Sequence, residues 1–166
     1  RHWNMEKRSV AEINSQYSAV PTDWLETIRF RLTDGSSSAL DLMTQADMVD
    51  YRAASFDAAG RPAYYAVSGG QFEFFPTPSD TYHAELLYYA KISALSDSNT
   101  SNWLLLDAPD VYLYGALIHS APYLADDARM AVWAALYQAA LDGLNTTSDA
   151  ARYSGAGLKL KMRTYR

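Results

Sequence analysis

The 166-residue sequence contains no cysteine, so disulfides, thiolate metal sites and cysteine-based catalysis are excluded. It also has no run of eighteen apolar residues, so no membrane-spanning helix and no membrane partner are expected. An apolar fraction of 49% and an aromatic fraction of 13% nevertheless predict a folded chain with a core of its own. The length indicates a single compact body.

Residues suited to metal or nucleophilic chemistry are also scarce. The three histidines, His2, His83 and His119, are far apart, and none has a second ligand at the helical spacing of a zinc motif. Nucleophile-elbow, phosphate-loop and dinucleotide-binding motifs are absent. Acidic pairs such as Asp126 and Asp127 are explained by helix capping. The sequence therefore predicts no catalytic residue, no metal site and no cofactor.

Charge is distributed unevenly along the chain. The net charge is −5, but residues 152–166 carry +5 and residues 1–151 carry −10. An acidic body repels nucleic-acid phosphates. Within the basic end, Leu158, Leu160 and Met162 alternate with basic residues, a strand-forming pattern that is stable only when it joins a sheet. This end is predicted to be an arm that docks on another protein or a neighbouring copy, with a solvated terminus as the alternative.

Residues 102–145 predict two helices joined by a tight corner. We expect Asp107 to cap the first helix, Pro109 to occupy its first turn and Pro122 to bend or end it. The second helix is expected to begin at residues 126–127. One of its faces is formed by residues at three- and four-residue spacing: Met130, Trp133, Tyr137, Ala140, Leu141 and Leu144. So few charges around this helix predict that it is buried or packed against another subunit.

The chain before these helices reads mainly as short strands. Residues 1–17 favour a helix, because Trp3, Val10, Ile13 and Tyr17 fit one helical face. A second helix, residues 44–54, is expected to be capped by Thr44. The expected strands are residues 24–32, 39–43, 63–67, 71–75 and 82–92, with a Gly-Gly turn between the third and fourth. The predicted class is α+β: a C-terminal antiparallel helical pair, a small antiparallel β region in the middle and an extended C-terminal arm.

Several stretches resemble one protein family. Residues 102–117 (NWLLLDAPDVYLYGAL), 121–129 (APYLADDAR) and 133–144 (WAALYQAALDGL) resemble the C-terminal helical part of head-to-tail adaptor (connector) proteins of tailed bacteriophages. Residues 20–25 and the region from 62 to 96 are similar to the family's β region. The resemblance divides the chain into an adaptor body, residues 1–154, and a C-terminal arm, residues 155–166.

The resemblance implies a non-enzymatic, structural role. Family members assemble as a homo-oligomeric ring, commonly dodecameric, in the neck of the virion below the portal protein. The ring extends the DNA channel, lets DNA pass without sequence-specific binding, and receives a tail or nozzle protein. Assembly would take place in the host cytoplasm. The residues expected to contact other subunits or the portal are Trp133, Tyr137, Leu158, Lys159, Leu160, Lys161, Met162, Arg163, Tyr165 and Arg166.

An enzymatic role is the alternative hypothesis. A small tail-associated cell-wall hydrolase would need two carboxyl groups from separate elements facing one cleft. Glu73 and Glu85, expected on adjacent strands, are the candidate acids.

Overall fold

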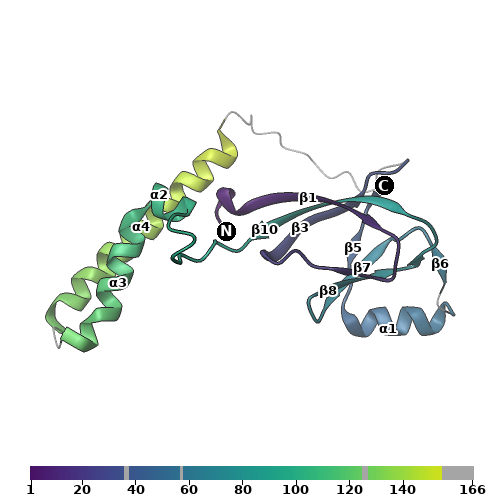
Figure 1. Cartoon of the computed structure of the whole chain (residues 1–166), viewed down its shortest axis with the longest axis horizontal. Coiled ribbons are helices and arrows are strands. Elements are labelled where there is room, and N and C mark those ends of the chain that lie inside the picture. Colours follow the sequence, from purple (N-terminus) through teal and green to yellow (C-terminus); the bar gives the residue numbers. More distant parts are fainter. Residues whose placement is uncertain (36–37, 57, 125–126, 155–166) are drawn as a thin grey trace, which may run out of the picture. The chain divides into compact units, whose positions relative to one another are not determined.

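The computed structural model describes residues 1–35, 38–56, 58–124 and 127–154 (Figure 1). The chain forms two compact units, one of Arg1–Asn4 with Ala94–Arg166 and the other of Met5–Ser93. We call them the helical unit and the β unit. The predicted α+β class is confirmed. The boundary expected at residue 154 stays a prediction, because the proposed arm lies outside the described residues.

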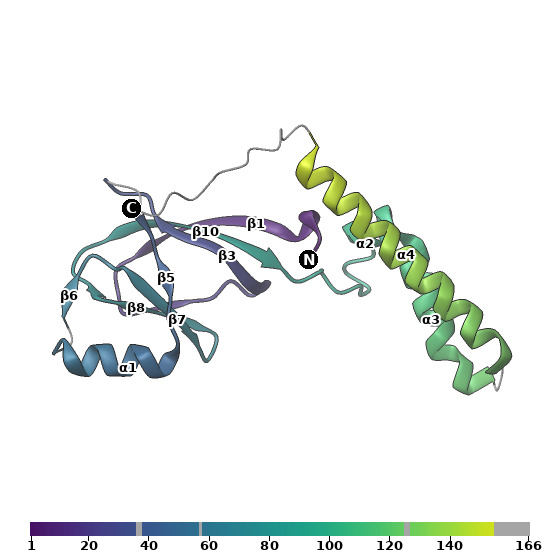
Figure 2. The ribbon, with the colours of Figure 1, turned by 180° about the vertical axis from the view of Figure 1, so that it is seen from behind.

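Two four-stranded sheets make up most of the β unit (Figures 1 and 2). The first sheet has the antiparallel order β1-β10-β3-β4, and the second has the order β2-β8-β7-β5, in which only the β5–β7 pair is parallel. The strands of the first sheet are β1 (Glu6–Ile13), β10 (Tyr82–Ala90), β3 (Trp24–Leu32) and β4 (Ser38–Ala39). Those of the second are β2 (Tyr17–Ala19), β8 (Gln71–Phe75), β7 (Tyr64–Ser68) and β5 (Asp41–Leu42). A short parallel pair, β6 (Ala59–Gly60) with β9 (Thr77–Pro78), completes the unit.

The two sheets face each other across an aromatic core. Alternate residues of β10 are buried, as the period-two pattern of this strand predicts. They meet Phe30 of β3, whose ring lies 5.3 Å from that of Tyr65 on β7 and 5.6 Å from that of Phe74 on β8, both edge to face. Phe74 and Leu32 are completely buried. Offset ring packing of this kind stabilises the contact beyond the area that it buries.

Helix α1 (Gln45–Ala54) covers the other face of the second sheet. It begins as predicted: the Thr44 hydroxyl accepts a hydrogen bond from the backbone N–H of Asp47 at 3.2 Å. Met48 is completely buried and packs with Ala66 and Phe75 of the second sheet. The β unit therefore has three layers, namely the first sheet, the second sheet and α1 (Figure 1).

The helical unit contains α2 (Trp103–Asp107), α3 (Pro109–Leu124) and α4 (Asp127–Tyr153). Helices α3 and α4 lie side by side (Figures 1 and 2). The chain's N-terminus belongs to the same unit: the His2 ring stacks on that of Trp103 at 4.7 Å, and the backbone N–H of Trp3 donates to the Ser148 hydroxyl at 3.1 Å.

Three expectations for the β unit were wrong. Residues 6–13 form strand β1, not part of a helix, because they pair with β10 along their whole length. Consequently the β region begins near the N-terminus rather than in the middle of the chain. The stretch 39–43 is not one return strand: β4 pairs with β3 in the first sheet, whereas β5 pairs with β7 in the second.

Two expectations for the helices also need correction. Asp107 does not cap the longer helix but is the last residue of α2, whose N-cap is Asn102. Its carboxylate accepts a hydrogen bond from the Asn4 side chain at 2.7 Å instead. Pro122 lies inside α3, which continues to Leu124. A proline in this position removes one backbone donor, and here the helix ends only two residues later.

The β7–β8 turn gives a testable consequence for stability. Gly69 and Gly70 have φ values of +57° and +77°, a conformation that costs little only for glycine. Replacing Gly70→Ala should lower the free energy of unfolding by about 1 kcal/mol through backbone strain, since no atom lies within 4 Å of the added Cβ. The Gly60→Ala control has an ordinary φ and room for a methyl group, so its change should stay within about 0.5 kcal/mol. Urea unfolding of both variants measures the difference, and equal stabilities would contradict this explanation.

Candidate interaction surface

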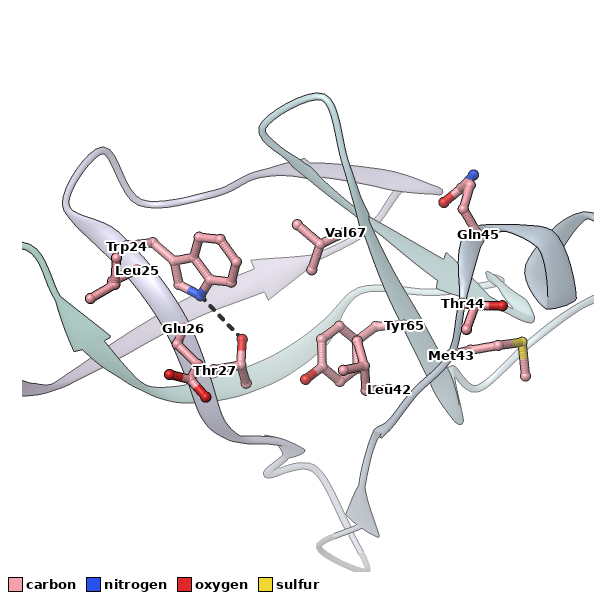
Figure 3. Close-up of a pocket in the computed structure, with 10 residues that line it drawn as sticks. All are labelled: Trp24, Leu25, Glu26, Thr27, Leu42, Met43, Thr44, Gln45, Tyr65 and Val67. Carbon is pink, nitrogen blue, oxygen red and sulfur yellow. Dashed lines mark hydrogen bonds between the residues drawn. The ribbon is translucent and has the colours of Figure 1, made fainter. Parts of the chain in front are cut away.

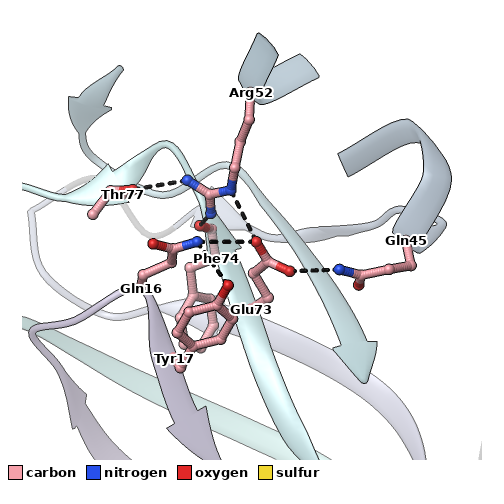
Figure 4. A network of polar contacts seen from close by, with 7 residues as sticks. All are labelled: Gln16, Tyr17, Gln45, Arg52, Glu73, Phe74 and Thr77. Atoms are coloured by element: carbon pink, nitrogen blue, oxygen red, sulfur yellow. Dashed lines mark hydrogen bonds and ion pairs between the residues drawn. The ribbon is translucent and has the colours of Figure 1, made fainter. Parts of the chain in front are cut away.

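Glu73 is almost completely buried on β8 and is surrounded by donors (Figure 4). Its Oε1 accepts hydrogen bonds from Arg52 Nε at 2.8 Å and from Gln16 Nε2 at 3.1 Å, and its Oε2 accepts from Gln45 Nε2 at 2.7 Å. Arg52 also donates to the backbone carbonyl of Phe74 at 2.7 Å. Burial raises the pKa of Glu73, but the three donors and the Arg52 charge outweigh it and hold the pKa below its ordinary value.

Glu85 lies in the other sheet, on the outer face of β10. It forms an ion pair with Arg31 at 2.9 Å and a longer one with Arg8 at 3.7 Å. The expectation that Glu73 and Glu85 stand on adjacent strands was therefore wrong, because β8 and β10 belong to different sheets. Two separated carboxylates, each paired with arginine, do not form the opposed acid pair that glycoside hydrolysis requires.

A pocket of about 530 Å³ opens between β3 and the segment leading into α1 (Figure 3). Its lining is mainly apolar and includes the ring of Trp24, whose Nε1 donates to Thr27 Oγ1 at 3.1 Å. Glu26 is the only carboxylate among the lining residues. The pocket therefore brings together no acid–base pair and none of the residues predicted as contacts.

Two of the predicted contact residues are half-buried within the chain itself. Trp133 and Tyr137 stand on the side of α4 where the residues have reduced exposure. The Tyr137 ring lies against α3, since a Cβ added to Gly115 would meet its Cε2 at 3.5 Å. Their contact with other subunits stays a prediction. The remaining predicted residues, Leu158–Arg166, lie outside the described residues.

The opposite side of α4 is exposed and apolar. Val132 is 58% exposed and Leu136 41% exposed, and the small side chains of Ala135 and Ala139 lie beside them at helical spacing. Exposed apolar side chains on the other helices of this unit are Leu106, Leu113 and Tyr123. No aspartate, glutamate, lysine or arginine occurs in residues 111–124 or 130–141. An exposed surface of this composition is typical of a protein–protein contact.

Sequence reasoning selected the half-buried face of α4, with Leu136 widening it and Ala135 and Ala139 on the other sides, and it named no contact residue on the exposed side. The signal was present in the small and apolar residues on the remaining sides of the helix, but the sequence alone did not say which side α3 covers. We define the apolar helical surface as Val132, Ala135, Leu136 and Ala139 of α4.

The histidines are placed separately from one another. His2 is buried against Trp103, and this burial lowers its pKa. His83 stands 3.8 Å from Glu12, and His119 is exposed on α3. Within the described part of the chain, no group of three potential metal ligands is present. No described helix is long and apolar enough to cross a membrane.

An exposed helical surface without charged side chains is typical of a protein that assembles with other proteins. The family model described as SU10 adaptor protein matches residues 1–159, and the chain belongs to this family of bacteriophage head-to-tail adaptors. The family resemblance of the sequence is thereby confirmed. No curated protein matches the chain significantly. As an adaptor, the protein is a component of a phage virion and interacts with other virion proteins.

The Glu73 network predicts a specific response to acid. Because the folded-state pKa of Glu73 is lowered, its contribution to stability is present above the ordinary value of 4.5 and is lost as the pH falls through the folded value. Glu73→Gln removes the carboxylate charge that pairs with the partly buried Arg52 and should reduce the free energy of unfolding at pH 7 by about 3 kcal/mol.

Urea unfolding of the wild type and of Glu73→Gln at pH 7 and at pH 3 measures this effect. The difference in the free energy of unfolding between the two proteins should be smaller at pH 3 than at pH 7. Glu12→Gln is the control, because its side chain is 63% exposed and a change within about 0.5 kcal/mol is expected. A gap that is the same at both pH values would show that the Glu73 charge does not stabilise the fold.

Proposed function

We propose that the protein forms a ring below the portal of the virion, extends the DNA channel and attaches the tail, without catalysing a reaction. Membership of the adaptor family supports this role. The observation that carries it is the apolar helical surface, which a free monomer would expose to water. In a ring, the same surface on every copy would be covered by a neighbour.

The ring is proposed to be a dodecamer built from heterologous contacts. Such contacts join two different faces of neighbouring copies, and they close when the rotation between copies is regular. The excess of negative charge over residues 1–151 supports a channel from which DNA is repelled rather than bound. A tail or nozzle protein would then attach at the far end of the ring.

The basic C-terminal arm is proposed to reach the portal protein. Its alternation of apolar and basic residues supports addition to a partner sheet as an extra strand, and its charge supports contact with an acidic surface. Portal and neighbouring copy are the two possible recipients, and family membership favours the portal. Trp133 and Tyr137 remain proposed contact residues within the helical pair.

The apolar helical surface can be tested with one charge. Val132→Glu should abolish ring assembly on the portal, because closing the contact would bury an unpaired carboxylate. Asn145→Glu, which adds the same charge to an exposed position on another side of α4, should assemble normally. Electron microscopy of portal–adaptor complexes and native mass spectrometry provide the measurement. Normal rings from the Val132 variant would exclude this surface from the contact.

The arm can be tested by truncation. Removing residues 155–166 should leave a protein with an unchanged thermal midpoint that no longer binds the portal, because the arm supplies the docking segment. A full-length variant with Lys159→Glu, Lys161→Glu and Arg163→Glu should also fail to bind the portal if the charge of the arm contributes to docking. Particles counted by infectivity and by electron microscopy give the readout. Infectious particles assembled from truncated protein would refute the docking role.

A further inference from the structure

The four edge strands of the two sheets differ greatly in length. Strand β1 has eight residues and pairs with β10 along its whole length, whereas β2 has three residues and β4 and β5 have two each. Among the described residues, no strand lies on the other side of β1 (Figures 1 and 2). Every residue of β1 except Ile13 is exposed or half-buried. An edge strand turns alternate backbone N–H and C=O groups away from its sheet, so a long exposed edge is a template for a further strand.

A pocket of about 340 Å³ lies beside this edge, between the two sheets. Small residues flank it on both edge strands, Ser9 and Ala11 on β1 and Ser18 and Ala19 on β2. The residues at its base are buried and apolar: Ile13, Phe30, Phe72, Ala84 and Leu86. Ala11 and Ala19 are exposed, so the pocket reaches the surface where β1 and β2 are the edge strands. A large apolar side chain from outside would regain the packing contacts that these small residues leave unmade.

The outer face of β1 carries an exposed glutamate near each end, Glu6 and Glu12. Both lie on the side of the strand opposite to the pocket, because their partners on β10 alternate with the buried residues of that strand. The two basic residues of β1, Lys7 and Arg8, are each paired with a carboxylate of the β unit, at 2.6 Å and 3.7 Å. A strand added to this edge would therefore have one row of side chains beside an apolar pocket and the other row beside glutamates.

The sequence of the arm, residues 155–166, matches both rows, although the arm itself lies outside the described residues. In an extended chain, successive side chains point to opposite sides. The apolar side chains of the arm are Leu158, Leu160 and Met162, and they alternate with Lys159, Lys161 and Arg163. Residues 155–166 contain four basic residues and no acidic one, so their charge complements that of the glutamates on β1. A nucleic acid would instead be repelled by these glutamates.

We propose that the edge of β1 binds the arm of a second copy as a further strand, in the protein that has not yet met a portal. The apolar side chains of the arm enter the pocket between the sheets, and its basic side chains lie beside Glu6 and Glu12. This contact rests on the proposed role of the arm as a docking strand. It identifies the surface that the arm covers before the portal takes its place.

Strand direction favours the arm of a second copy over that of the same chain. Every pair in the first sheet is antiparallel, the arrangement that is slightly more stable per residue. Arg1–Asn4 belong to the helical unit, where the backbone N–H of Trp3 donates to the Ser148 hydroxyl at 3.1 Å, and they lead directly into β1. An arm that follows α4 of the same chain would therefore approach β1 from its first residue and run parallel to it. The arm of a second copy is free of this restriction, and twelve extended residues span about 40 Å.

Pairing the edge with the arm also removes a hazard. An uncovered edge strand and a strand-forming arm both tend to pair with other chains. Each copy offers one acceptor and one donor, so two copies can satisfy each other reciprocally. The contact is short and its ion pairs are exposed, which allows a portal sheet to replace it.

Amide hydrogen exchange, measured by NMR on the full-length protein without a portal, tests the contact. The N–H groups of β1 that point away from β10 should be protected in concentrated solution. They should exchange about tenfold or more faster on dilution, because the covering strand comes from another molecule. The N–H groups of β1 that bind β10 stay protected under both conditions and are the internal control. Fast exchange of the outward groups at every concentration would overturn the proposal.

Two variants identify the arm as the covering strand. Leu160→Asp would place a carboxylate in the apolar pocket and should remove the protection at every concentration. Ala156→Asp adds the same charge before the alternating stretch and should leave the protection unchanged. Protection that survives Leu160→Asp would overturn the assignment of the arm. Protection that Leu160→Asp removes but dilution does not would place the arm of the same chain on the edge and overturn the exchange between copies.

Charge reversal on β1 tests which way the strand faces. Glu6→Lys combined with Glu12→Lys should raise the dissociation constant of self-association about tenfold, because the basic row would face like charges. The rescue variant adds the arm substitutions Lys159→Glu, Lys161→Glu and Arg163→Glu. It places opposite charges together again and should recover most of the affinity in analytical ultracentrifugation. Glu26→Lys is the control, because it lies on the same face two strands from the edge, where salt screens its charge.

A dissociation constant that the β1 substitutions leave unchanged would overturn this arrangement of the arm. These measurements contain no portal, so the contact can fail while the arm still docks on the portal. Conversely, infectious particles from truncated protein would refute the docking role without affecting the protection of β1 in the free protein.

Discussion

The buried carboxylate of Glu73 is the constraint on which the layered β unit depends. A charge in that position is costly unless it is paired and fully hydrogen-bonded, and here Arg52 and Gln45 of α1 supply most of the donors. Gln16, on the segment between β1 and β2, donates as well (Figure 4). The Glu73 side chain of β8 thereby holds both α1 and the segment between β1 and β2 in place. With α1 held against the second sheet, its outer side and the outer face of the first sheet become the two exposed faces of the stack.

Local signals in the sequence were enough for part of this architecture. The hairpin of β7 and β8 could be predicted because two aromatic runs flank Gly69 and Gly70, whose positive φ values the turn requires. Helix α1 could be predicted because Thr44 caps it through a contact only three residues away. Strand β10 could be predicted from strict alternation. Each of these features is determined by neighbours in the chain.

The errors concern features set by distant residues. Strand β1 was mistaken for a helix because Val10, Ile13 and Tyr17 fit a helical period, whereas the deciding partner was β10, far along the chain. Glu73 and Glu85 were placed on adjacent strands because their strands are close in sequence, yet each strand joined a different sheet. The exposed side of α4 was missed for the same reason, since periodicity identifies a face but not the element that covers it. Which elements pack against each other, and therefore which surfaces stay exposed, could be seen only in the three-dimensional structure.

The two units offer surfaces suited to different tasks in an assembly. Removing apolar surface from water provides most of the free energy of association, and the apolar helical surface is free of charged side chains that would have to be desolvated. Exposed ion pairs add little affinity, but they disfavour wrong orientations strongly. Exposed charged residues are therefore better suited to selecting which faces meet than to holding them together. The proposed ring would need both tight binding and a single orientation, because a heterologous contact that binds tightly but accepts several orientations would produce open chains instead of closed rings.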